Sequence, residues 1–72
     1  MEEIRDIDNH MLCEVDPYKG ILIKRVKKDV EEMRISMPVG CIVNFVRKNS
    51  FTVLRREGEA SLRVHKYRQD NR

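Results

Sequence analysis

Basic side chains are the residues of this sequence best suited to bind a ligand. They gather in two stretches, which comprise Lys24, Arg25, Lys27 and Lys28 in the first and Arg55, Arg56, Arg63, Lys66 and Arg68 in the second. Clustered Lys and Arg side chains bind phosphate groups and release the counterions around them, so we hypothesise that these residues bind nucleic acid. Interleaved acidic residues, namely Glu31, Glu32, Glu57 and Glu59, are at least as typical of an ordinary solvated surface.

Aromatic residues add little to this hypothesis. In the last predicted strand, Arg63 and His65 point toward solvent, where Tyr67 can stack beside them. The sequence shows no zinc-finger motif, no RNP-type motif and no aromatic-rich platform for single strands. The nucleic-acid hypothesis therefore rests on charge.

Histidine and cysteine offer one short motif, in which His10 precedes Cys13 by three residues, while Cys41 and His65 lie far along the chain. A zinc site needs four converging ligands, usually in two close pairs, and only one close pair is present. We therefore predict no metal site. Both cysteines are interpreted as small buried hydrophobic residues with reduced thiols.

Catalytic motifs are missing from the sequence. The serines Ser36, Ser50 and Ser61 lie outside any G-x-S-x-G context, and the glycines are too scattered to form a phosphate-binding loop. A chain of 72 residues is also too small to enclose a deep substrate cleft. We predict a protein that is not an enzyme and that needs no cofactor.

The composition narrows the class of protein further. The chain has 72 residues, of which 40% are apolar and 38% are charged, which fits one small globular domain. No apolar run approaches the ~20 residues of a membrane span. The N-terminus has no basic and apolar leader, so we expect a cytoplasmic protein. Because small cores often gain stability from oligomerisation, a homodimer is an open alternative to a monomer.

Charge is unevenly distributed along the chain. Residues 1–16 hold six acidic residues against Arg5, a net charge of −5, whereas the rest of the chain carries +8 and the whole chain +3. We therefore divide the sequence into an acidic leader at 1–16, a basic domain at 17–66 and a polar tail at 67–72 that frays.

Helical spacing occurs twice in the first half. In the leader, the apolar residues Ile4, Ile7, Met11 and Val15 follow it, which predicts a short helix. In residues 17–33 it is followed by Leu22, Val26, Val30 and Met33, after Asp16 as an N-cap and Pro17 in the first turn.

A hairpin competes with the second helix. Gly20 and several β-branched residues disfavour a helix in this segment. In the competing interpretation, Gly20–Val26 and Met33–Met37 are strands, and Lys27–Glu32 is a charged turn between them. The sequence favours the helix but leaves both structures open.

The last third predicts a three-stranded antiparallel meander. Cys41–Arg47 is a dense β-branched and aromatic run, which is typical of a central strand. Two further strands, Phe51–Arg56 and Ala60–His65, follow turns at residues 48–50 and 57–58, in the first of which Asn49 can adopt a left-handed conformation. The predicted fold is therefore α+β, with one or two short helices packed on this meander. A small all-β barrel with residues 20–37 as a hairpin is the alternative.

These observations predict a small regulatory or adaptor module that acts by binding. Nucleic acid, bound through the two basic stretches, is the sharper version of this hypothesis. The alternative is a protein–protein interaction module or inhibitor that uses the edge of its sheet or the acidic leader helix.

Overall fold

The protein is all-β. Its structure is a computed structural model that describes residues 1–25 and 31–69, and this part of the chain contains no helix. The strands are β1 (Glu2–Arg5), β2 (Met11–Asp16), β3 (Ile21–Arg25), β4 (Glu32–Ser36), β5 (Ile42–Arg47), β6 (Ser50–Gly58) and β7 (Ser61–Arg68). The predicted α+β fold is therefore wrong. Within the described residues there is also no helical segment with the length and apolar character to cross a membrane.

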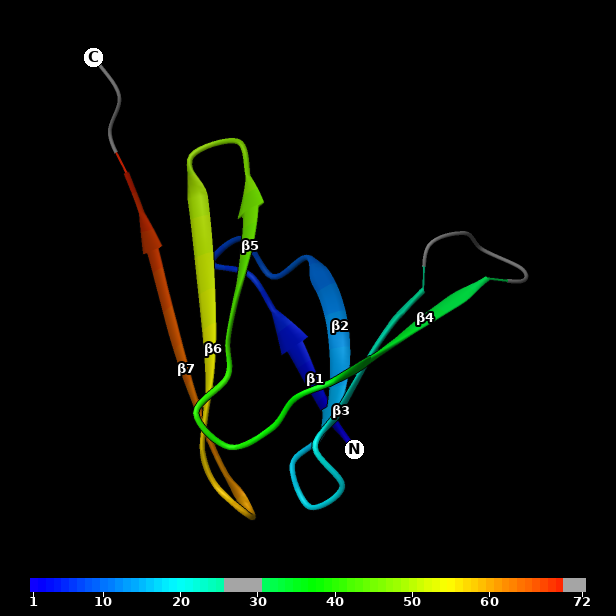
Figure 1. The fold of residues 1–72 in the computed structure, drawn as a ribbon. Helices are drawn as coiled ribbons and strands as arrows, with labels where there is room; N and C mark the ends of the chain where they lie inside the picture. The colour runs from blue at the N-terminus through cyan, green and yellow to red at the C-terminus, as the bar shows by residue number, and fades with distance from the viewer. Residues whose placement is uncertain (26–30, 70–72) are drawn as a thin grey trace.

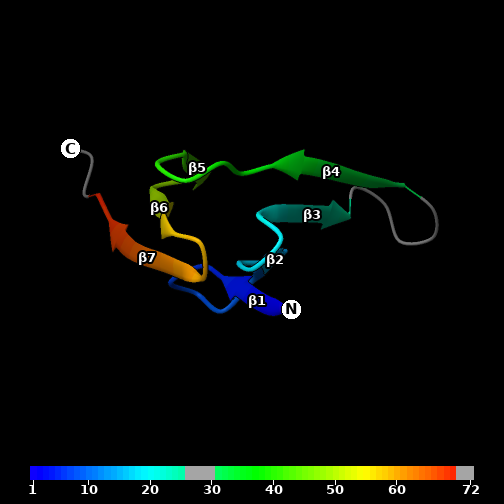
Figure 2. The same cartoon turned by 60° about the horizontal axis from the view of Figure 1, so that its bottom comes forward.

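The strands form two antiparallel sheets rather than one barrel (Figure 1). One sheet has the order β1-β2-β3-β4 and the other β5-β6-β7, so each strand pairs with its neighbour in sequence. Residues 37–41 carry the chain from the first sheet to the second. Figure 2 shows the hairpin of β3 and β4 extending away from the second sheet.

The hydrophobic core lies between the two sheets. Its buried residues are Ile4, Cys13, Val15 and Leu22 from the first sheet, Met37 from the connection and Leu54 from β6, and the half-buried Cys41, Val43, Phe45 and Leu62 pack against them. Leu22 and Leu54 are completely buried. Because side chains alternate along a strand, the inward position of Leu54 also places Ser50 and Thr52 in the interior.

The helix predicted for the acidic leader is wrong. The leader forms the hairpin of β1 and β2, in which Ile4 pairs with Cys13. Its turn is closed by a hydrogen bond from the Asn9 amide to the Asp6 carbonyl oxygen (2.9 Å), with Asn9 at a φ of 69°. Asp and Asn favour such turns, and here this preference overrides the helical spacing of the apolar residues. The leader is therefore a structural part of the core.

The helix predicted for residues 17–33 is also wrong, whereas the two strands of the competing hairpin are present. β3 and β4 pair from Ile21 opposite Ser36 to Arg25 opposite Glu32. Residues 26–30, which include most of the predicted turn, lie outside the described part of the chain.

The contacts of Asp16 explain why an N-cap residue at this position did not begin the helix predicted for residues 17–33. Its side chain accepts hydrogen bonds from the amides of Tyr18 (3.1 Å) and Lys19 (3.2 Å), as an N-cap would. The Gly20 amide then donates to the Asp16 carbonyl oxygen (2.8 Å), and Gly20 has a φ of 67°. The same side-chain hydrogen bonds therefore close a turn, and the chain reverses into β3.

The predicted three-stranded meander is confirmed as β5, β6 and β7, although three details differ. First, β5 lies at an edge of its sheet and is not central. Second, Lys48, and not Asn49, has the positive φ, at 56°. Third, Tyr67 and Arg68 belong to β7 and not to a fraying tail. Residues 70–72 of that tail lie outside the described part.

Arg56 joins the second sheet to the connection between the sheets. Its Nη1 donates to the Met37 carbonyl oxygen (2.9 Å) and its Nη2 to the Glu59 carbonyl oxygen (3.0 Å). Its backbone amide and carbonyl are bonded to Cys41 (3.1 Å) and Gly40 (2.7 Å). This guanidinium therefore links β6 to the connection between the sheets and to the turn before β7.

Candidate nucleic-acid interface

The two residues of the first basic stretch that the structure describes, Lys24 and Arg25, both contact other side chains of the protein. Lys24 points to the inner side, where its Nζ lies 5.5 Å from the centroid of the Phe45 ring. Arg25 is bound to two carboxylates, with its Nη1 3.0 Å from Glu14 and its Nη2 3.7 Å from Glu32. Lys27 and Lys28 lie outside the described residues.

Arginines of the second stretch are also engaged within the protein. Arg56 is bonded to backbone carbonyls, as described above. The Nε of Arg63 lies 3.1 Å from the Glu57 carboxylate, and Arg68 pairs with Asp8. The structure therefore spreads the predicted binding residues over several places.

Among the described residues of the two basic stretches, Arg55 and Lys66 have not yet been placed. They lie on opposite faces of the second sheet. Neither forms an ion pair with any residue in 1–25 or 31–69. Lys66 pairs with the inward-facing Thr52, whereas Arg55 pairs with Arg63 on the face that points away from the core. A ligand on one face of the sheet could thus contact one of these two bases but not both.

An aromatic row crosses the face that points away from the core, which we call the outer face. The strand registers place on it Ile42, Asn44, Val46, Phe51, Val53, Arg55, Arg63, His65 and Tyr67. The rings of Phe51 and Tyr67 are stacked, with centroids 5.1 Å apart and an interplanar angle of 9°. The ring of His65 lies 5.3 Å from that of Tyr67 at 36°. The row is partly open to solvent, since Tyr67 is 39% exposed.

Positive charge adjoins the aromatic row on the same face. Arg55 and Arg63 are direct cross-strand partners. Like charges in this position destabilise a sheet, unless an anion lies between them. Glu57 neutralises Arg63, so Arg55 is the cation left for an external anion such as a phosphate group. The outer face thus combines flat aromatic surfaces with a guanidinium group.

Sequence reasoning placed Arg63, His65 and Tyr67 together on a solvent face but missed Phe51. The register of β6 and β7 could have revealed Phe51, because the turn after Gly58 sets Phe51 opposite Tyr67 and Val53 opposite His65. The polarity of β6 hides this arrangement. Its inner face holds the polar residues Ser50 and Thr52, whereas its outer, partly exposed face holds Phe51, the reverse of what is usual for a strand with one buried face.

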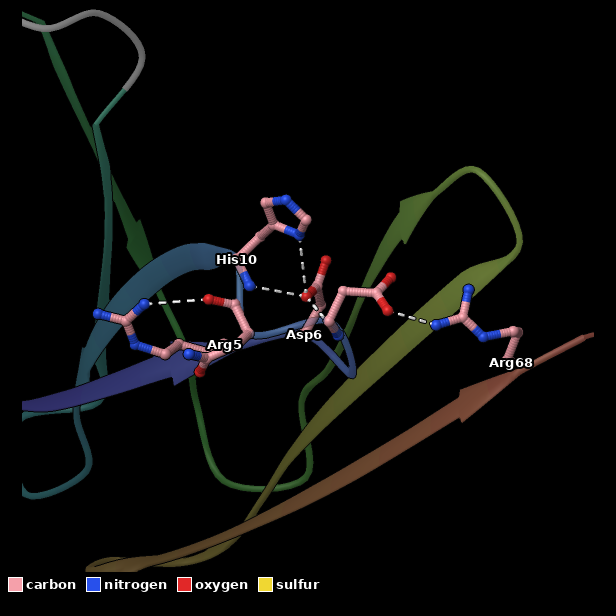
Figure 3. Close-up of polar contacts among 6 residues, drawn as sticks. Arg5, Asp6, His10 and Arg68 are labelled. Carbon is pink, nitrogen blue, oxygen red and sulfur yellow. Dashed lines mark hydrogen bonds and ion pairs between the residues drawn. The ribbon is translucent and has the colours of Figure 1, made fainter.

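A polar cluster in the turn between β1 and β2 is explained by its role in the hairpin (Figure 3). Ligand-type atoms of Asp6, Asp8 and His10 lie within 4.8 Å of one another. Asp6 Oδ1 accepts hydrogen bonds from the amides of Asp8 (2.9 Å) and His10 (2.8 Å), and Asp8 Oδ1 binds Arg68. The cluster closes the turn and ties it to the end of β7.

The buried Asp6 carboxylate makes stability dependent on pH. The hydrogen bond from the His10 amide, helped by that from Asp8, lowers the pKa of Asp6 below its ordinary value of 3.8. A lowered folded-state pKa stabilises the protein above 3.8, and this stabilisation is lost as pH falls below that value. We expect Asp6→Asn to be less stable than the wild type at pH 7 in urea denaturation, and the difference to shrink below pH 3.8. A difference of equal size at both pH values would contradict this role for the charge.

The two cysteines differ in their surroundings. Cys13 is 3% exposed in the core, and desolvation raises the pKa of its thiol to about 11. Cys41 is half-buried and packs at the margin of the core. The placement of Cys13 fits its interpretation as a buried hydrophobic residue, whereas Cys41 is buried only in part.

No family model, curated protein or solved structure matches this chain.

Proposed function

We propose that the protein is a binding module that takes single-stranded nucleic acid on the outer face of β5, β6 and β7, and that it acts without catalysis. The observation that carries the proposal is the aromatic row of Phe51, Tyr67 and His65 beside Arg55. Unpaired bases stack on aromatic side chains, and such stacking stabilises a complex by roughly 1–3 kcal/mol per base. In a duplex the base faces are covered, so the row favours single strands. The protein would meet such strands in the cytoplasm.

The proposal differs from the sequence-based hypothesis in its location and in the force that dominates. Few cations face the ligand, so stacking supplies most of the affinity and salt has a modest effect. With Arg55 as the one free contact, since Glu57 pairs with Arg63, log K should fall with a slope of about −0.7 in log salt, at ~0.7 per phosphate for a single strand. A protein that used all nine bases of the two stretches would show a slope several times steeper.

We expect Tyr67→Ala to weaken binding of a fluorescein-labelled 12-nucleotide single strand by roughly 5- to 150-fold, because a stacking surface is lost. Fluorescence anisotropy with single-stranded RNA, single-stranded DNA and the matched duplex provides the measurement. Arg55→Ala and Lys66→Ala are a matched pair, since they remove one exposed positive charge from opposite faces of the sheet. Arg55→Ala should weaken binding, whereas Lys66→Ala should not.

Two results would overturn the proposal. The first is no anisotropy change with any single strand at micromolar protein and low salt. The second is equal loss of affinity in Arg55→Ala and Lys66→Ala together with no effect of Tyr67→Ala, which would indicate diffuse electrostatic attraction. Circular dichroism of each variant shows whether the fold is intact.

A further inference from the structure

We propose that two copies of this protein associate through the open edge of β4, so that their four-stranded sheets continue into one antiparallel sheet. In the described part of the chain, β4 is an end strand with no neighbour beyond it. All five of its residues are exposed, including the apolar Met33 (49%) and Ile35 (37%). An exposed strand edge presents unpaired amides and carbonyls that pair readily with another strand. This proposal is independent of the outer face of the second sheet.

The pattern of backbone hydrogen bonds identifies the residues that face the open edge. The Met37 amide donates to the Gly20 carbonyl oxygen (2.7 Å), so Met37 and Gly20 are a hydrogen-bonded pair. Hydrogen-bonded and non-hydrogen-bonded pairs alternate along antiparallel strands, and no bulge interrupts β3 and β4. The backbone groups of Ile35 and Met33 therefore face β3. Those of Glu32, Arg34 and Ser36 point outward and are available to a partner strand.

Side-chain charges then select the register of the pair. A register with Glu32 opposite its own copy, or Arg34 opposite its own copy, sets like charges against each other, which is destabilising. A shift that sets Arg34 opposite Ser36 brings Pro38, which has no amide hydrogen, into the ladder opposite Glu32, and a shift that sets Ser36 opposite its own copy brings Pro38 opposite Arg34. In the remaining register Glu32 of each copy lies opposite Arg34 of the other. This register forms two opposite-charge pairs, and the outward backbone groups of Glu32 and Arg34 can form hydrogen bonds with those of the second copy.

The apolar side of β4 agrees with this register. Met33 and Ile35 pair with Lys24 and the buried Leu22, so they lie on the inner side of the sheet. With Glu32 opposite Arg34 of the second copy, Met33 lies opposite Met33 of that copy. On this side Ile35 lies opposite Glu31 of the second copy, so the opposite-charge pairs and the contact between the two Met33 side chains are what favour a second copy over an unrelated peptide. A five-residue edge is small against the ~1,600 Å² of a typical specific interface, so the dimer should dissociate on dilution.

Single charge reversals provide a test that also fixes the register. Glu32→Arg and Arg34→Glu each create two like-charge pairs, so each variant alone should sediment as a monomer where the wild type is a dimer. An equimolar mixture should form a heterodimer, because every facing pair is then of opposite charge. Analytical ultracentrifugation over a concentration series measures all three, and circular dichroism confirms that each variant is folded.

A cysteine cross-link checks the same geometry without changing charge. Non-hydrogen-bonded partners have Cα atoms ~4.5 Å apart, within the range of a disulfide, so Met33→Cys should cross-link under mild oxidation. The matched control Ile35→Cys should not, because the two copies of that position lie far apart in this register. Both variants would carry Cys41→Ser. A monomeric wild type at all concentrations overturns the proposal, and so does a dimer that survives both charge reversals or that the Ile35→Cys variant cross-links equally well.

Discussion

Gly20→Ala is expected to destabilise the protein more than any exposed substitution in the chain. Gly20 has a φ of 67°, in the left-handed region where an L side chain is strained by roughly 1–3 kcal/mol. A Cβ atom here would also lie 2.8 Å from the Met37 carbonyl oxygen and would collide with the Arg56 guanidinium. Since that guanidinium binds the same carbonyl, the substitution disturbs the point where the sheets are joined. Urea denaturation followed by circular dichroism measures the loss.

Gly40→Ala is the matched control for this prediction. Gly40 also has a positive φ, at 94°, but an added Cβ would meet nothing within 4 Å. Both substitutions therefore place an L side chain at a positive φ, with Gly40 the further from the left-handed helical region, and only Gly20→Ala adds the steric contact with Met37 and Arg56. Equal losses for the two variants would show that the close approach at Gly20 does not matter.

Leu54→Ala is expected to lower the free energy of unfolding by about 2–5 kcal/mol. Leu54 is completely buried and is the one fully inward apolar residue that β6 supplies to the core. Its truncation removes buried apolar surface and leaves a cavity where the two sheets meet. A single core of this size supplies only ~3–5 kcal/mol in total, so the variant should be largely unfolded at 25 °C.

Val46→Ala tests whether burial causes that effect. Val46 lies in the same sheet but is 62% exposed on the outer face, so its truncation should change stability by no more than about 0.5 kcal/mol. Thermal and urea denaturation of both variants make the comparison. A cooperative transition for Leu54→Ala close to that of the wild type would mean that the sheets do not depend on this contact.

The sequence was most informative where turn residues and strand residues agreed. In the last third, β-branched and aromatic runs alternate with turn signals, and the meander follows from both. In residues 17–33, helical spacing and the Asp16-Pro17 pair favoured a helix, while Gly20 and the β-branched residues favoured a hairpin. The two structures share the same local hydrogen bonds at Asp16, so only pairing with distant residues could decide between them.

The candidate site could be predicted only in part for a related reason. Charge is visible in a sequence, but its neutralisation is not, because Glu14, Glu57 and Asp8 reach their arginines across strands. The stacked pair of Phe51 and Tyr67 depends on a register that a shift of one residue would destroy. Packing against the first sheet, and not the polarity of β6, decides which of the two alternating rows of β6 faces the core.

The pairing of every strand with its sequence neighbour has a consequence for how the molecule forms. All ladders close over short stretches of chain, so each sheet can assemble quickly from its own hairpins. Neither sheet alone buries its apolar face, because Leu54 of the second sheet packs in one cluster with the buried residues of the first sheet. We expect docking of the two sheets about residues 37–41 to be slower than the closing of their hairpins. During synthesis, the inner surface of the first sheet should therefore stay exposed until β6, which carries Leu54, has left the ribosome.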